Sequence, residues 1–88
     1  MLSNNEQITK IKQALGIGAG IPDATIDVWL TDVKDYMKNA GVPIDVINAD
    51  STIGTLTRGV SDCWSYGAGG TGLSPLFKER VAQLALGA

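Results

Sequence analysis

The sequence predicts an all-α fold, a small bundle of four main helices plus one short helix, connected by glycine-rich loops. Apolar residues recur at intervals of three, four and seven in separate stretches, which is the spacing that gives a helix one core-facing side. Glycines and prolines stand between these stretches, at positions where helices usually end and begin. A chain of 88 residues suffices for one domain with a modest core, so we assign residues 1–88 to a single helical domain.

Two helices are expected in the first half of the chain. The motif S-N-N-E at residues 3–6 matches a capping box, so the first helix should begin there and end at Gly16. The second helix should run from about Asp23 to Asn39, because Gly41 and a proline follow it. Its apolar stripe is the cleanest in the chain and is predicted to face the core: Ile26, Trp29, Leu30, Val33, Tyr36, Met37 and Ala40.

The second half should form a helix, a glycine loop and another helix, after a short helix that begins at Pro43. The first long helix should start at Asp50 or Ser51, and Gly67 follows its last apolar turn. The second should start at Ser74-Pro75, an N-cap followed by a first-turn proline, and run to about residue 86. The predicted core residues are Ile53, Leu56, Val60, Cys63 and Trp64 in the first helix, and Phe77, Val81, Leu84 and Ala85 in the second.

The composition argues against several classes of function. A net charge of −2 and a pI of about 4.7 lack the basic footprint of a nucleic-acid-binding protein. The chain has no histidine, and its single cysteine, Cys63, lies on a predicted core stripe, so we expect no metal, no cofactor and no catalytic centre. No apolar run is long enough for a membrane span and no secretory signal begins the sequence, so we expect synthesis in a cytoplasm and no membrane partner.

The helix at 23–39 offers one candidate interface. Trp29 and Tyr36 lie on one edge of its apolar stripe, where aromatic rings either cap a core or anchor a partner. Asp32 and Asp35 lie on the flank beside that edge, and two lysines lie on the opposite flank. A helix with opposite charges on its flanks can meet copies of itself head to tail, and a solvated face without a partner is the alternative.

The helix at about 51–66 offers a second candidate interface. Thr55, Gly59, Asp62 and Tyr66 share a face that points away from the predicted core stripe. A glycine inside a helix costs about 1 kcal/mol relative to alanine, so Gly59 suggests close approach of another backbone, with a weak helix that tolerates glycine as the alternative. We predict a contact surface on this face, extended by the loop and by the leucines outside the core stripe of the last helix: Gly69, Gly70, Leu76 and Leu86.

Four segments between about residue 35 and 86 form an ordered pattern: D-Y-M-K-N-A-G-V at 35–42, V-I-N-A-D-S-T-I-G at 46–54, T-R-G-V-S-D-C-W-S-Y-G at 57–67 and L-S-P-L-F-K-E-R-V-A-Q-L-A-L at 73–86. The most specific part is Asp62-x-Trp64-x-Tyr66-Gly67, a glycine loop, and then Leu73-Ser74-Pro75-x-Phe77. In this pattern the chain resembles the small head–tail connector proteins, also called adaptor or head-completion proteins, of long-tailed phages and related prophages.

The resemblance implies an all-helical subunit of the phage neck, at the head–tail interface of the virion, without catalytic activity. Such subunits form a homo-oligomeric ring, generally of twelve copies, on the portal protein. The ring extends the DNA channel toward the next connector, stopper or tail-completion protein, so DNA passes nearby without specific binding. In many members the C-terminal region reaches into the portal, and here residues 76–88 or another segment would carry that attachment.

Two other classes of function fit less well. A small helix-turn-helix regulator of phage origin needs basic or amide side chains on its recognition helix, and the exposed positions of the helix at 51–66 offer only one, Arg58. A small enzyme needs a convergent set of reactive side chains, which the sequence does not suggest. We therefore take the neck subunit as the leading hypothesis and the DNA-binding regulator as the alternative.

Overall fold

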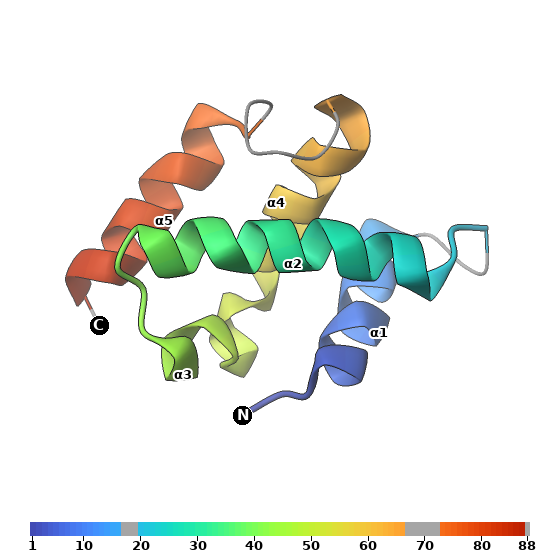
Figure 1. The fold of residues 1–88 in the computed structure, drawn as a ribbon, viewed down its shortest axis with the longest axis horizontal. Helices are drawn as coiled ribbons and strands as arrows, with labels where there is room; N and C mark the ends of the chain where they lie inside the picture. Colours follow the sequence, from blue (N-terminus) through green and yellow to red (C-terminus); the bar gives the residue numbers. More distant parts are fainter. Residues whose placement is uncertain (17–19, 67–72, 88) are drawn as a thin grey trace.

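The computed structural model describes residues 1–16, 20–66 and 73–87, except for the side chain of Tyr66. In these ranges it contains five α-helices, one short 3₁₀ segment and no strand (Figure 1). The elements are α1 (Asn4–Leu15), α2 (Asp23–Asn39), α3 (Ile44–Ile47), the 3₁₀ segment η1 (Asp50–Thr52), α4 (Ile53–Tyr66) and α5 (Pro75–Gly87). The predicted all-α fold with four main helices and one short helix is therefore confirmed. The glycine loop at 67–72 lies outside the described residues.

Local hydrogen bonds explain where α1 and α5 begin. The Ser3 hydroxyl accepts a hydrogen bond from the Glu6 N–H (3.2 Å), and a Glu6 carboxylate oxygen accepts one from the Ser3 N–H (3.0 Å), so the predicted capping box is present. These bonds hold the pKa of Glu6 below its usual value. At α5 the Ser74 hydroxyl accepts a hydrogen bond from the Phe77 N–H (3.2 Å), as an N-cap should.

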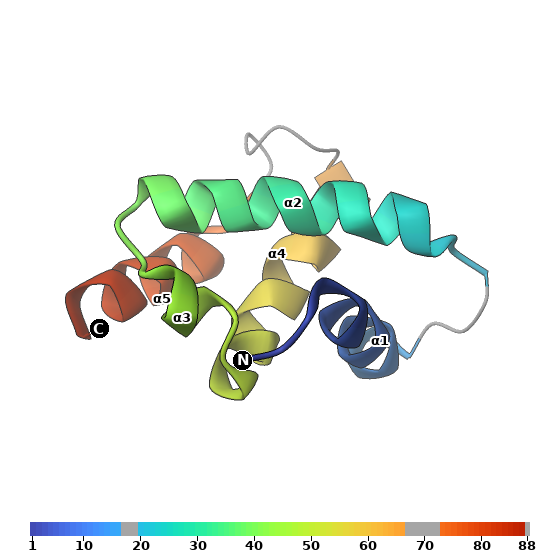
Figure 2. The same cartoon turned by 60° about the horizontal axis from the view of Figure 1, so that its bottom comes forward.

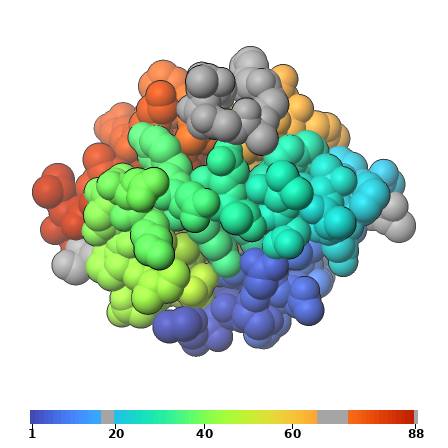
Figure 3. Space-filling model, in the orientation of Figure 1, coloured from blue at the N-terminus to red at the C-terminus, as the bar shows by residue number. Residues whose placement is uncertain are grey.

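The helices form two layers around a common core. Figure 2 shows α2 lying above α4, with α1 and α5 on either side of α4. The N-terminal segment joins the end of α3, because the Leu2 N–H donates to the Asn48 carbonyl (2.9 Å). The inner side of α2 contributes side chains with no exposed surface, Ile26, Leu30, Val33 and Met37. Its outer side runs across the middle of one face of the molecule (Figure 3).

Three helices converge at Gly59, which lies buried in α4. A Cβ added there would lie 2.7 Å from Cε1 of Phe77 in α5 and 2.8 Å from both methyl carbons of Val33 in α2. Carbon atoms in contact normally stay about 3.5–4.0 Å apart, so only glycine lets the three helices meet at this spacing. The close approach that Gly59 suggested is present, but it is made by side chains of the same chain.

The core departs from the predicted stripes at their edges. Trp64 is 46% exposed, because it lies at the edge of the α4 stripe and stacks on Trp29 with the ring centroids 6.4 Å apart. Ala40 is exposed, because it is the residue at which α2 ends. The prediction that these two side chains face the core is wrong. Leu84 and Ala85 are only partly buried against it.

Candidate interaction surface

The face of α4 that was predicted to contact a partner is covered by α5 of the same chain. Thr55 and Asp62 are 7% and 6% exposed, and Gly59 is buried against Phe77. Asp62 Oδ2 accepts a hydrogen bond from the Ser74 N–H (3.0 Å), which ties the end of α4 to the start of α5. The prediction that Gly59 and Asp62 form an outward contact surface is therefore wrong, because the apolar face of α5 needs the same side of α4 for its own burial. Thr55 is also buried, but it lines a groove between α4 and α5.

The two aromatic residues predicted as interface anchors contact the core. Trp29 stacks on Trp64 with the two rings 18° from parallel, and Tyr36 packs against Phe77 with the ring centroids 5.7 Å apart. Both Trp29 and Tyr36 are half-buried against the core. These contacts favour the alternative in which the aromatic rings cap the core.

Several of the remaining predicted interface residues lie at the surface. Asp35 is exposed and Asp32 is half-buried, both on α2. Leu76 and Leu86 of α5 are 60% and 89% exposed. The structure adds Val28, an α2 residue that is 61% exposed and that the sequence pattern did not single out. Outside the described part of the chain lie the side chain of Tyr66, Gly69 and Gly70.

One lysine of the basic flank of α2, Lys34, is engaged with α1. The Lys34 ammonium donates to the Gln7 side-chain carbonyl and to Asn4 Oδ1, and the Gln7 amide donates to Asn48 Oδ1 (3.0 Å). Gln7 has no exposed surface, so this chain of hydrogen bonds satisfies a buried polar group. Burial lowers the pKa of Lys34. Lys34 therefore holds α1 against α2 and does not offer the free positive charge that the flank pattern suggested.

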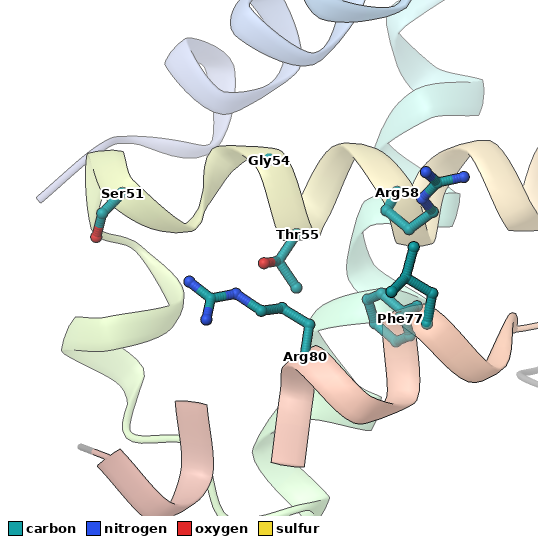
Figure 4. A pocket seen from close by; sticks show the side chains of 7 residues that line it. Ser51, Gly54, Thr55, Arg58, Phe77 and Arg80 are labelled. Atoms are coloured by element: carbon teal, nitrogen blue, oxygen red, sulfur yellow. The ribbon is translucent and has the colours of Figure 1, made fainter. Parts of the chain in front are cut away.

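A groove opens between α4 and α5. Its volume is about 320 Å³ and its lining residues are Ser51, Gly54, Thr55, Arg58, Leu76, Phe77 and Arg80, a set that we call the arginine groove. Figure 4 shows Arg80 reaching from α5 toward Ser51 and Thr55, whereas Arg58 lies on α4 near Phe77. A second hollow of about 280 Å³ adjoins it, since Gly54 and Arg58 line both. Gly54 borders open space, because a Cβ there would meet no atom within 4 Å.

The charge of the arginine groove is unusual for this protein. The chain has two arginines, and both line the groove although the net charge is −2. Arg80 donates to the Gln83 side-chain carbonyl (3.1 Å). Among the described residues neither guanidinium forms an ion pair with a carboxylate, and the one ion pair present joins Lys12 to Asp23 (2.6 Å).

Sequence reasoning missed the groove because its parts come from distant segments. Arg58 and Arg80 are far apart along the chain, and only the packing of α5 on α4 brings them to one groove. Gly54 is a glycine inside a predicted helix, and its sequence position alone does not indicate a groove. Gly54 is exposed whereas Gly59 is buried, and this difference depends on which side of α4 the other helices cover.

Cys63 is the titratable group of α4 whose pKa is raised. Burial, and secondarily the charges of Asp32 and Asp62, raise the pKa of Cys63 to about 11, so its thiol stays protonated and is not a nucleophile. No group of three or more potential metal ligands lies together in residues 1–16, 20–66 and 73–87. Within the same ranges no helix has both the length and the apolar character required to cross a bilayer. The arrangement of apolar surface and guanidinium groups is suited to binding.

Comparison with known proteins gives no match to a family model, to a curated protein or to a solved structure.

Proposed function

We propose that the chain is a structural subunit of a tailed-phage neck, which forms a ring on the portal protein and extends the DNA channel toward the tail. In this role it serves virion assembly, genome retention and genome passage, without catalysis. Its partners are further copies of itself, the portal protein and the next connector, stopper or tail-completion protein. DNA passes through the ring without specific binding.

The observation that carries the proposal is the junction between α4 and α5. The most specific part of the resemblance to connector proteins falls on this junction, and its residues have linked structural tasks. Asp62 accepts a hydrogen bond from the Ser74 N–H, and the Ser74 hydroxyl caps α5. Leu73 and Phe77 are 6% and 1% exposed. Because these residues together fix one helix junction, their match to the connector pattern supports a shared local fold. A match between unconnected surface residues would support it less.

Deletion of the reading frame from the phage or prophage genome that encodes it tests the proposal. We expect DNA-filled heads and separate tails that fail to join, counted by electron microscopy of the lysate together with infectious titre. The same deletion strain carrying the intact gene on a plasmid is the control, and it should restore joined particles. A deletion strain that still produces joined, infectious particles would contradict the proposal.

The DNA-binding alternative makes a different prediction for the purified protein. A helix-turn-helix regulator binds duplex DNA through basic side chains, and its affinity falls steeply as salt rises. The exposed side of α4 carries one basic residue, Arg58, and the side of α4 that contains Gly59 is covered by α2 and α5. We expect no shift of a duplex probe at moderate salt, and a salt-sensitive shift would favour the regulator instead.

A further inference from the structure

The arginine groove has the chemistry of a site for a carboxylate that stands beside an apolar side chain. A guanidinium binds a carboxylate through two parallel hydrogen bonds. Two guanidinium groups that pair with no carboxylate of the described residues therefore favour an acidic ligand. Leu76, which is 60% exposed, gives the same groove apolar surface above the buried ring of Phe77. A ligand that satisfies both features is an acidic protein segment with an apolar anchor. The apolar lining has no counterpart on the phosphate backbone of a nucleic acid.

The outer side of α2 presents this combination. Val28 and Asp35 are exposed there, and the half-buried Asp32 adds a second negative charge. At 100° per residue the three positions fall within about 60° of arc, and Val28 and Asp35 stand about 10 Å apart along the helix axis. We call these three residues the acidic ridge.

The acidic ridge and the arginine groove lie on opposite sides of the molecule. The inner sides of α2 and α4 face each other, since a Cβ on Gly59 would touch Val33. Asp35 is on the side of α2 away from α4, and Arg58 is on the side of α4 away from α2, and both are exposed. Figure 2 shows the same order, with the outer side of α2 forming one surface of the molecule. Surfaces so placed cannot meet within one chain and can join copies only head to tail.

We propose that the acidic ridge of one copy docks in the arginine groove of a second copy. The contact pairs Asp35 with the guanidinium groups of the groove and places Val28 against the apolar lining, and Asp32 adds negative charge beside it. This inference rests on the proposed function, because a ring of identical subunits needs a head-to-tail contact that repeats around a closed circle. The inference names the two surfaces through which neighbouring subunits of the ring would contact each other.

Two double variants, each lacking one surface, test the docking. Arg58→Ala/Arg80→Ala removes the charges of the groove, and Val28→Lys/Asp35→Lys reverses the ridge. All four side chains are exposed, so both variants should fold, which circular dichroism and a thermal melt check. Lys10→Ala/Lys78→Ala, which removes two exposed positive charges outside both surfaces, is the matched control.

Sedimentation velocity over a range of protein concentrations is the readout. The wild-type protein and the lysine control should form oligomers that dissociate as ionic strength rises from ~0.01 M to ~1 M. Each arginine removed should weaken self-association about tenfold or more, and the reversed ridge should sediment as a monomer. An equimolar mixture of the two double variants should form a heterodimer and stop there, because it holds one intact ridge and one intact groove.

Several outcomes overturn the docking. The docking is wrong if the wild-type protein stays monomeric at low salt. It is also wrong if the mixture of the two double variants forms no heterodimer. Self-association that persists in both variants also overturns it and leaves the ring itself standing. The wild-type protein could instead bind a labelled DNA duplex and not associate with itself. If Arg58→Ala/Arg80→Ala then lost the DNA binding, the groove would be assigned to phosphate. The proposed function fails on a separate result, the assembly of joined particles by the deletion strain.

Discussion

Replacing Gly59 with alanine should destabilise the protein, although alanine is the better helix former. The added methyl would lie 2.7 Å from Phe77 Cε1 and 2.8 Å from Val33 Cγ1 and Cγ2, each at least about 0.7 Å inside normal carbon contact. Val33 and Phe77 are 0% and 1% exposed, and the branched side chain of valine is restricted at χ1, so neither can turn away. The helices themselves must therefore move apart.

Two opposing terms set the size of this effect. Overpacking a core costs about 1–3 kcal/mol, and three simultaneous overlaps on rigid neighbours place Gly59→Ala near the upper end. The gain in helix propensity is about 1 kcal/mol, which leaves a net destabilisation of about 2 kcal/mol. For a domain of this size that lowers the melting temperature by about 8–16 °C.

Gly54→Ala is the matched control, because Gly54 lies in the same helix with no atom within 4 Å of an added Cβ. It should raise stability by up to about 1 kcal/mol, so the two substitutions should have opposite signs. Urea and thermal unfolding followed by circular dichroism measure both. In the background Val33→Ala, which removes two of the three overlaps, the cost of Gly59→Ala should shrink. The reasoning is refuted if Gly59→Ala melts at or above the temperature of the wild-type protein.

Three further predictions concern side chains around α4. Asp62→Ala should cost about 1–3 kcal/mol in urea unfolding, because it leaves the Ser74 N–H without its acceptor, whereas Asp62→Asn keeps an acceptor and should cost less. Thr57→Val should be neutral or stabilise the protein by about 1 kcal/mol, because the buried Thr57 hydroxyl has no hydrogen-bond partner in the described part of the chain, and a clear loss would show that it has one. The raised pKa of Cys63 favours the neutral thiol in the folded state, so its contribution is full below the unfolded pKa of 9.0 and is lost as pH rises through about 11. The free energy of unfolding should fall over that interval in the wild-type protein and less in Cys63→Ala, and equal slopes would contradict the assignment.

The elements of the fold could be predicted from sequence because their ends depend on local chemistry. Hydrogen bonds between residues three apart form both the capping box at residues 3–6 and the cap at Ser74. The residue types at that spacing are therefore enough to predict them. The helix at 23–39 was predicted with the bounds that the structure has, because glycine and proline follow it closely. Periodicity likewise identified most of the core, since it shows which side of a helix is apolar.

The interaction surfaces could not be predicted in the same way. Periodicity shows the direction of a face but not which element covers it. Thr55, Gly59 and Asp62 were correctly grouped on one side of α4, yet α5 of the same chain covers that side. The arginine groove has no local signal at all, because it exists only once α5 has packed on α4. Whether a small-residue face serves a partner or the chain itself is a tertiary property.

The hydrogen bond between Asp62 and Ser74 has a consequence for how this protein can change over evolution. It fixes the register of α5 on α4 from residues on either side of the segment at 67–72, so that register does not require a particular sequence in the connection. Lengthening a connection whose ends are already held costs little, about 0.6 kcal/mol for each doubling. The connection is therefore a site where insertions, natural or engineered, should be tolerated while the helix pair keeps its geometry.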